Sequence, residues 1–192
     1  MAIANGPRKY ATCLLFAALP ALSAAAPVIN ELDVTNEEQT YTISFDVLVA
    51  GDAAKARSIV SDYRQWPAVS EAVTEARLVA RYPDGRQRVS VTLRACMLVI
   101  FCKSVRQVKD LHPLVLPDTY RTVLVAGEGN FSSGYETWQV SADGRNKTRL
   151  KYHSVLVLAF RLPPVIGPWV LRRHLQNELV RTAKNVEMLL AR

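Results

Sequence analysis

Glu136, Arg94 and Tyr152 are the residues of this sequence whose types best suit acid–base chemistry. A carboxylate, a guanidinium and a phenol could serve as base, acid or oxyanion donor if they turned into one cavity. Their spacing does not place them together, so this chemistry is one open alternative and we name no catalytic residue. Arg94 and Glu136 are our candidates for polar residues of a cavity.

The three histidines give no sign of a metal site. His112, His153 and His174 stand apart in the sequence. They lack the i, i+4 spacing that places two metal ligands on one helix face. We therefore expect neither a metal ion nor another cofactor.

Basic residues outnumber acidic ones but are dispersed along the chain. The sequence has 24 Lys and Arg against 17 Asp and Glu, a formal net charge of +7. No helix-turn-helix, zinc-finger or RNA-binding motif accompanies them, so we expect no nucleic-acid partner. A solvated surface explains most of these charges, and weak attraction to anionic lipid head groups is a secondary explanation.

Aromatic residues recur along the inferred strands and at the entrance to the last helix. Packing in the core is one explanation for them, and contact with a bound ligand is the other. The candidates for ligand contact are Trp66, Phe131, Tyr135, Trp138, Tyr152 and Trp169.

Residues 1–26 have the organisation of a secretory signal peptide. Two basic residues precede an apolar run from Ala11 to Leu22, and small residues follow as far as Ala26. The run is shorter than the ~20 residues that span a bilayer and contains Pro20, which argues against a retained anchor. We expect cleavage near Ala26 and a periplasmic or secreted mature protein.

Export would leave two cysteines, Cys96 and Cys102, and an even pair in an exported protein predicts a disulfide. The residues between them, 97–101, are all apolar, although a hairpin connection is normally polar. Such a segment either folds back over the protein or meets an apolar surface. We expect a cavity mouth or a transient membrane contact at Leu98, Val99, Ile100 and Phe101.

The upstream sequence favours strands. Residues 41–49 alternate between apolar and polar, which is typical of a half-buried strand. Asp52 is placed to cap a short helix over 53–61. Residues 27–39 are polar and acidic without periodicity, so we expect a flexible leader. Six further stretches, with turn signals between them, predict an antiparallel meander over 72–82, 88–95, 103–111, 119–126, 135–141 and 148–158.

The last stretch of the chain predicts one long helix. Prolines crowd its entrance and no Gly or Pro follows Pro168. Leu171, Leu175 and Leu179 fall on one face of this helix. Such a long apolar stripe needs a broad surface beneath it, which the strands can supply. We therefore predict an α+β fold in which a curved antiparallel sheet of about seven strands wraps around the C-terminal helix.

Four stretches together resemble a known superfamily. They read Asp62-Tyr-x-x-Trp66-Pro67, Cys96-x5-Cys102, Phe131-Ser-x-Gly134-x-Glu136-x-Trp138 and Phe160-x-x-Pro163-Pro-x-Ile-Gly-Pro-Trp169. In this order they resemble the START-like (SRPBCC) superfamily of polyketide cyclases, lipid-transfer proteins and coenzyme Q-binding proteins. The resemblance implies one START-like domain over 40–192, with the helix-grip fold of the START/Bet v 1 kind around a hydrophobic cavity.

The resemblance also implies a function, which we state as an expectation. The protein would be an exported binding protein for a hydrophobic small molecule such as a lipid or quinone, held between the sheet and Leu171, Leu175 and Leu179. One alternative is a cyclase or dehydratase-type enzyme acting on a polyketide-like substrate. Another is an envelope protein-interaction module that docks through the apolar hairpin tip.

Overall fold

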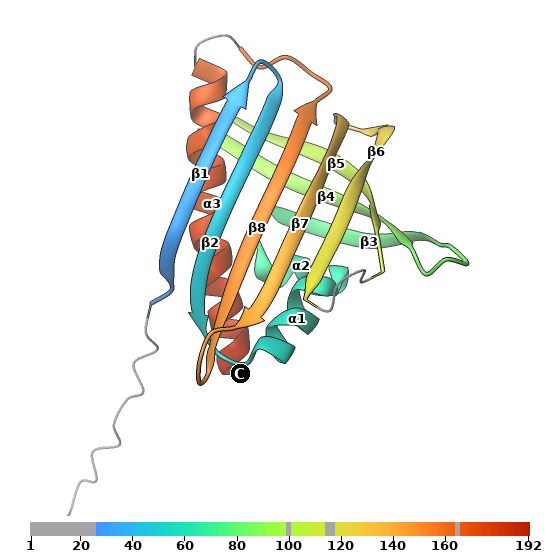
Figure 1. The fold of residues 1–192 in the computed structure, drawn as a ribbon. Coiled ribbons are helices and arrows are strands. Elements are labelled where there is room, and N and C mark those ends of the chain that lie inside the picture. Colours follow the sequence, from blue (N-terminus) through green and yellow to red (C-terminus); the bar gives the residue numbers. More distant parts are fainter. Residues whose placement is uncertain (1–25, 99–100, 114–117, 164–165) are drawn as a thin grey trace, which may run out of the picture.

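Alternation of apolar and polar residues builds one curved sheet with a long helix along its concave side (Figure 1). The computed structural model describes residues 26–98, 101–113, 118–163 and 166–192, without the side chains of 95–98, 101 and 166. Within these residues eight strands are joined in the order β1-β2-β8-β7-β6-β5-β4-β3. Every neighbouring pair is antiparallel. The predicted α+β helix-grip architecture is confirmed.

The strands are β1 (Val28–Glu37), β2 (Thr40–Ala50), β3 (Val73–Arg81), β4 (Gln87–Leu98), β5 (Phe101–Leu111), β6 (Thr119–Gly129), β7 (Phe131–Ala142) and β8 (Lys147–Leu158). The helices are α1 (Ala53–Ser61), α2 (Trp66–Val69) and α3 (Ile166–Ala191), with a short 3-10 helix, η1, over Tyr63–Gln65. Each predicted strand corresponds to one observed strand, and most observed strands are longer because paired ends continue into the turns.

The first strand corrects the prediction of a flexible leader over 27–39. Residues Val28–Glu37 form β1, which pairs antiparallel with β2 along its full length. Val34 is fully buried and Leu32 packs against the core. The acidic residues of the strand, Glu31, Asp33 and Glu37, are exposed, and a register shift between Ile29 and Glu31 interrupts the alternation. An exposed edge strand with an irregularity therefore looked like a leader in the sequence.

Helix α3 is held against the sheet by its predicted apolar stripe. At 26 residues and ~1.5 Å per residue it is about 39 Å long. Its buried apolar residues belong to the same core cluster as the inward side chains of β2. A Cβ at Gly51 would lie 2.7 Å from the Cβ of Leu190, so only glycine permits the last turn of α3 to approach the end of β2. No helix among the described residues is long and apolar enough to cross a membrane.

Helices α1 and α2 lie below the concave side of the sheet (Figure 1). The side chain of Asp52 accepts a hydrogen bond of 2.8 Å from the backbone N–H of Lys55, as the predicted cap requires. After η1, the chain turns again into α2, with Pro67 in the first turn. The indole N–H of Trp66 donates to the carbonyl of Val60 at 2.9 Å. This hydrogen bond fixes the Trp66 ring beneath the sheet.

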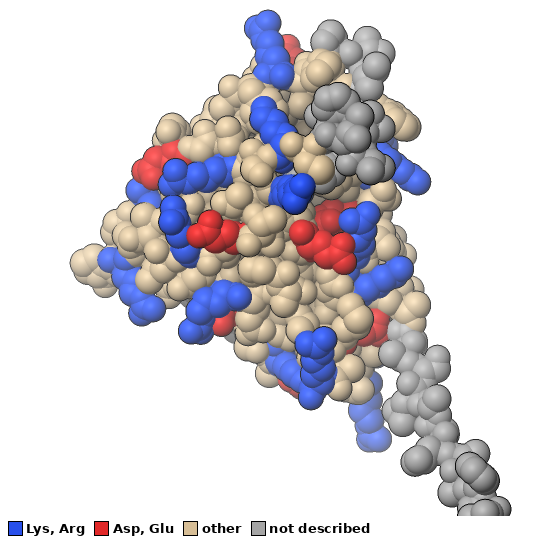
Figure 2. All heavy atoms as spheres, turned by 180° about the vertical axis from the view of Figure 1, so that it is seen from behind, with Lys and Arg blue, Asp and Glu red and all other residues tan. Residues whose placement is uncertain are grey.

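Charged side chains are spread over the surface. Figure 2, which views the molecule from behind, shows Lys and Arg spread over that face, with Asp and Glu among them. Several form exposed pairs, such as Arg64 with Asp62 at 2.8 Å. This arrangement agrees with the interpretation of the basic residues as a solvated surface.

The backbone brings the two cysteine positions opposite one another. In the β4–β5 hairpin, Cys96 is the register partner of Cys102. Directly opposed residues of antiparallel strands have Cα atoms about 4.5 to 5.5 Å apart, within the range that a disulfide spans. The chain thus turns between the cysteines, as the prediction requires.

We predict that the mature protein contains the Cys96–Cys102 disulfide. Closing so small a loop should stabilise the fold by about 2 kcal/mol. Thiol titration of unfolded, unreduced protein from the periplasm should find no reactive thiol, and reduction should lower the midpoint of urea unfolding. Two reactive thiols per mature chain before reduction would contradict this prediction.

Candidate ligand-binding cavity

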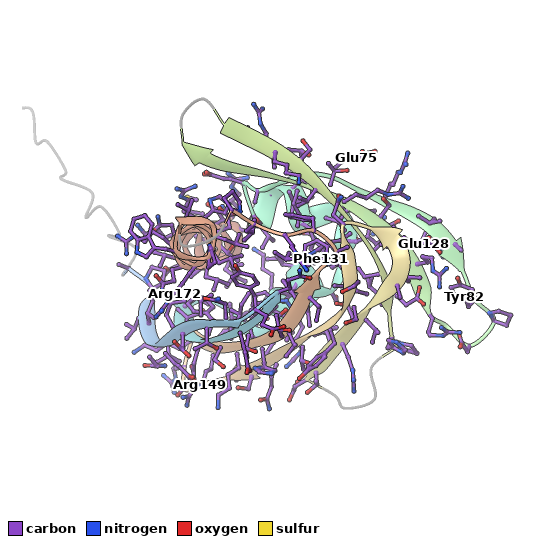
Figure 3. All side chains as sticks on the ribbon, turned by 90° about the horizontal axis from the view of Figure 1, so that it is seen from above. Glu75, Tyr82, Glu128, Phe131, Arg149 and Arg172 are labelled. Atoms are coloured by element: carbon purple, nitrogen blue, oxygen red, sulfur yellow. The ribbon has the colours of Figure 1, made fainter. Side chains whose placement is uncertain are left out.

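A cavity of about 300 Å³ lies between the concave face of the sheet and α3. Seen from above in Figure 3, α3 stands on the open side of the sheet and Phe131 points into the space between them. Arg149, Glu75 and Glu128 lie on the outer side of the sheet. Because alternate strand residues face opposite sides, one set of side chains lines the cavity and the other meets water.

The structure brings most of the predicted cavity residues together. Helix α3 contributes leucines from its first half and its middle, and the strands and α2 contribute aromatic rings. Trp138 and Tyr152 are neighbours across β7 and β8, with ring centroids 4.6 Å apart. The predicted residues that line the cavity are Trp66, Phe131, Trp138, Tyr152, Leu171, Leu175, Leu179, Arg94 and Glu136.

Two predicted aromatic residues do not line the cavity. Tyr135 alternates with Glu136 and therefore lies on the other face of β7, where its hydroxyl is 3.3 Å from Nε2 of His153. Trp169 is 68% exposed. It precedes Leu171 by two residues, about 200° around a helix, and so points away from the leucine stripe. Both residues were selected by type, and the phase of their strand or helix places their side chains away from the cavity.

A buried ion pair forms the polar part of the cavity wall. Nζ of Lys109 on β5 donates to Oε2 of Glu136 on β7 at 2.7 Å. The Thr122 hydroxyl on β6 donates to the same oxygen at 3.1 Å. Lys109 is 5% and Glu136 8% exposed. The ammonium also lies 4.8 Å from the centre of the Trp66 ring.

Tyr152 extends this polar region. Burial raises the pKa of the Tyr152 hydroxyl well above its ordinary value, and the nearby Glu136 carboxylate raises it further. The phenol therefore stays protonated at neutral pH and can donate a hydrogen bond. Glu136 is also the register partner of Ser154 on β8, whose buried hydroxyl interacts with the Tyr152 phenol and partly opposes the rise of the Tyr152 pKa. Polar groups thus form a row across β5 to β8.

The wall contributed by α3 has its own polar residues. Glu178 accepts from the Ser70 hydroxyl at 2.6 Å and from the backbone N–H of Ala72 at 3.1 Å. These bonds tie α3 to the segment that joins α2 to β3. His174 lines the cavity one turn earlier. Burial lowers the pKa of His174, Arg181 lowers it too, and Glu178 opposes the shift.

One end of the cavity is bordered by residues that also meet solvent. Nζ of Lys103 lies 3.8 Å from the centre of the Phe160 ring. Arg94 lines this cavity although the residue as a whole is exposed. The predicted mouth residues are only partly described. Val99 and Ile100 lie outside the described residues, and Leu98 and Phe101 have described backbones in β4 and β5 without described side chains. Their role at a mouth or membrane stays a prediction.

Sequence reasoning missed Lys109, Thr122 and His174. In β5 the residues at 105, 107, 109 and 111 line the cavity. This face includes Gln107 and Lys109, so polarity alone would assign it to solvent. The only sign in the sequence that this strand could place polar groups in a cavity was that neither of its faces is purely apolar. Among the described residues, no three His, Cys, Asp or Glu side chains gather as a metal site would require.

Several solved structures share this fold. A START superfamily protein from Mycobacterium smegmatis is 21% identical, with 78% of this chain and 97% of that chain covered and a TM-score of 0.61. The Zhui aromatase/cyclase from Streptomyces sp. R1128 is 12% identical, with 80% and 94% covered and a TM-score of 0.62. A STAR-related lipid transfer protein from Xanthomonas axonopodis is 11% identical, with 84% and 99% covered and a TM-score of 0.60.

These likenesses establish a START-like helix-grip fold for the chain. No protein-family model matches the sequence, and no curated protein matches it at a significant level. The fold is therefore known from structure, and the ligand must be inferred from the cavity.

We predict that Lys109→Met destabilises the protein by about 3 to 5 kcal/mol, because it leaves the Glu136 carboxylate buried without its partner. The double variant Lys109→Met/Glu136→Leu should recover most of this loss, since it removes both charges. Urea unfolding of the three proteins measures both changes. A loss below about 1 kcal/mol in the single variant would mean that the pair is solvated.

We also predict that His174 makes stability depend on pH. Its folded-state pKa lies below the ordinary value of 6.5, so the unfolded chain takes up this proton first. This contribution is complete above about pH 6.5 and is lost as the pH falls toward the folded-state pKa. The free energy of unfolding should decrease less between about pH 7.5 and pH 5.5 in His174→Gln than in the wild type. Equal decreases would contradict the assignment.

Proposed function

We propose that this protein is an exported binding protein that holds a hydrophobic small molecule between its sheet and α3. The observation that carries the proposal is the cavity of about 300 Å³, lined mainly by apolar side chains and containing one buried ion pair. Such a mixture, with few polar groups among apolar ones, is typical of small-molecule sites. The signal-like residues 1–26 lie almost entirely outside the described residues, and export is part of the proposal.

The size of the cavity supports a ligand on energetic grounds. An empty apolar void costs about 24 cal/mol per Å³, so a fully apolar space of about 300 Å³ would cost on the order of 7 kcal/mol if it stayed empty. Water can reach the polar row and the solvent-facing end of this cavity, so the argument applies to its apolar part next to α3. This is comparable with the ~5 to 15 kcal/mol that stabilises a domain. A ligand in contact with the walls would replace the missing packing.

The similar structures support binding as well. One is described as a lipid transfer protein and another as an aromatase/cyclase, and both share the helix-grip fold at TM-scores of 0.60 and 0.62. From these descriptions we carry to this chain only the binding of a small molecule, and its place between the sheet and α3 is inferred from the cavity. The choice among lipid, quinone and other apolar molecules depends on the cavity itself.

A cyclase or dehydratase-type enzyme is the second candidate, because Glu136 and Tyr152 do line one cavity. Their environment favours binding over catalysis. Glu136 is occupied by two donors on one oxygen. The raised pKa of Tyr152 keeps its proton in place, so it suits donation and not proton abstraction. Product analysis after incubation with a polyketide-like ketone tests this candidate.

We predict that Leu175→Trp fills the cavity and abolishes ligand binding while the fold persists. Leu175 lines the cavity from α3, where a larger ring would occupy the ligand's space. Titration with the neutral fluorophore N-phenyl-1-naphthylamine should show saturable binding to the wild type and at least a tenfold weaker affinity for the variant.

The matched control is Met188→Trp, which places the same ring on the same helix at a position that is 56% exposed. It should bind the fluorophore like the wild type. Circular dichroism checks that both variants keep their secondary structure. A folded Leu175→Trp protein with wild-type affinity would contradict binding in this cavity.

A further inference from the structure

We infer that the ligand presents a neutral oxygen, as in a ketone, quinone or hydroxyl group, to Lys109. Lys109 belongs to the row of polar groups across β5 to β8, which we call the inner wall of the cavity. The rest of the ligand, an apolar body of one to three rings or one short chain, extends toward α3. The inference rests on the proposed function and adds the chemical class of the ligand. It is carried by the geometry of the Lys109–Glu136 pair, by its charge balance and by the cavity volume.

Lys109 has donor capacity that the protein does not use. A lysine ammonium carries three N–H donors. One of them donates to Glu136 at 2.7 Å, and the other partner shown is the face of the Trp66 ring. Both Lys109 and Gln107, which lies two residues away on the same strand face, line the cavity. The Gln107 side chain makes no hydrogen bond among the described residues. A ligand oxygen at this wall would therefore meet unoccupied donors.

The charge balance selects against an anionic head group. Glu136 already neutralises Lys109, so a ligand carboxylate would bring a second negative charge into the same buried region. Two buried carboxylates that share one cation disfavour the ionised state. A ketone or hydroxyl oxygen can accept from Lys109 without this penalty. The remaining cationic lining residues, Arg94, Lys103 and Arg121, are exposed and do not belong to the inner wall.

The volume limits the rest of the ligand. About 300 Å³ is at the low end of the ~300 to 1,000 Å³ of small-molecule pockets. A compact ring system or one short chain fits this space, and a two-chain lipid does not. Leu171, Leu175 and Leu179 face the inner wall from α3 and would contact the apolar body.

Three probes with one naphthalene body separate the contributions. They are 2-ethylnaphthalene, 2-acetylnaphthalene and 2-naphthoate, which differ in having no oxygen, a neutral carbonyl and a carboxylate. Calorimetric titration of the wild type should give the tightest binding for the ketone. We expect its affinity to exceed that of each of the other two probes by at least about tenfold, since a hydrogen bond to a charged donor is a strong one.

Glu136→Gln reverses the preference. The amide keeps the shape of the side chain but leaves Lys109 without a counter-charge, so 2-naphthoate should bind at least about tenfold more tightly than to the wild type. The matched control is Glu75→Gln, because Glu75 lies on the outer side of the sheet (Figure 3) and should leave all three affinities unchanged. Should Glu136→Gln fail to fold, Thr122→Val, which removes one bond to Glu136 and keeps the charges, should still prefer the ketone to the carboxylate.

The outcomes separate this inference from the proposed function. Binding of no probe by the wild type would overturn both. Equal binding of 2-ethylnaphthalene and the ketone would leave the cavity as a binding site and overturn the contact with Lys109. Tight wild-type binding of 2-naphthoate that is lost in Lys103→Met would place the polar group at the exposed end, and it too would overturn the inference.

Discussion

The buried Lys109–Glu136 pair is the constraint on which the cavity depends. Removing two charges from water is unfavourable, and only close contact with additional hydrogen bonds offsets the loss. Glu136 receives two donors, from β5 and β6, and the ammonium also contacts the Trp66 ring on α2. Three neighbouring strands and a helix must therefore keep their register and position for the pair to survive. A fully apolar wall would impose no such requirement, so the pair points to a function beyond stability.

The fold provides this arrangement by separating packing from binding along α3. The second half of the helix, through Ala183, Val186 and Leu190, packs against β2 and its neighbours and is buried. The first half, through Leu171 and Leu175, is only half-buried and faces the cavity. Glu178 lies between the two halves and is bonded to the α2–β3 segment. The helix is thus anchored at its end and leaves space beneath its beginning.

Patterns of period two and 3.6 carried most of the prediction from sequence. They placed β2 to β8, α1 and α3, because the spacing of polar residues along a half-buried strand or an amphipathic helix shows which side of the element faces solvent. They failed at β1, where an edge strand exposes almost every side chain. They also failed to identify Lys109, because residue type alone does not distinguish a buried lysine in a strand from an exposed one. Trp169 is the opposite case, because this large apolar residue in the first turns of α3 lies on the solvent-exposed face of the helix.

Native mass spectrometry of the mature protein, isolated from the periplasm without organic solvent, shows directly whether the cavity holds a compact neutral ligand. We predict a population with one bound molecule per chain, released on activation as a compact neutral compound that contains oxygen. Chains that carry no molecule in any preparation, or that release a carboxylate or a two-chain lipid, would contradict this prediction.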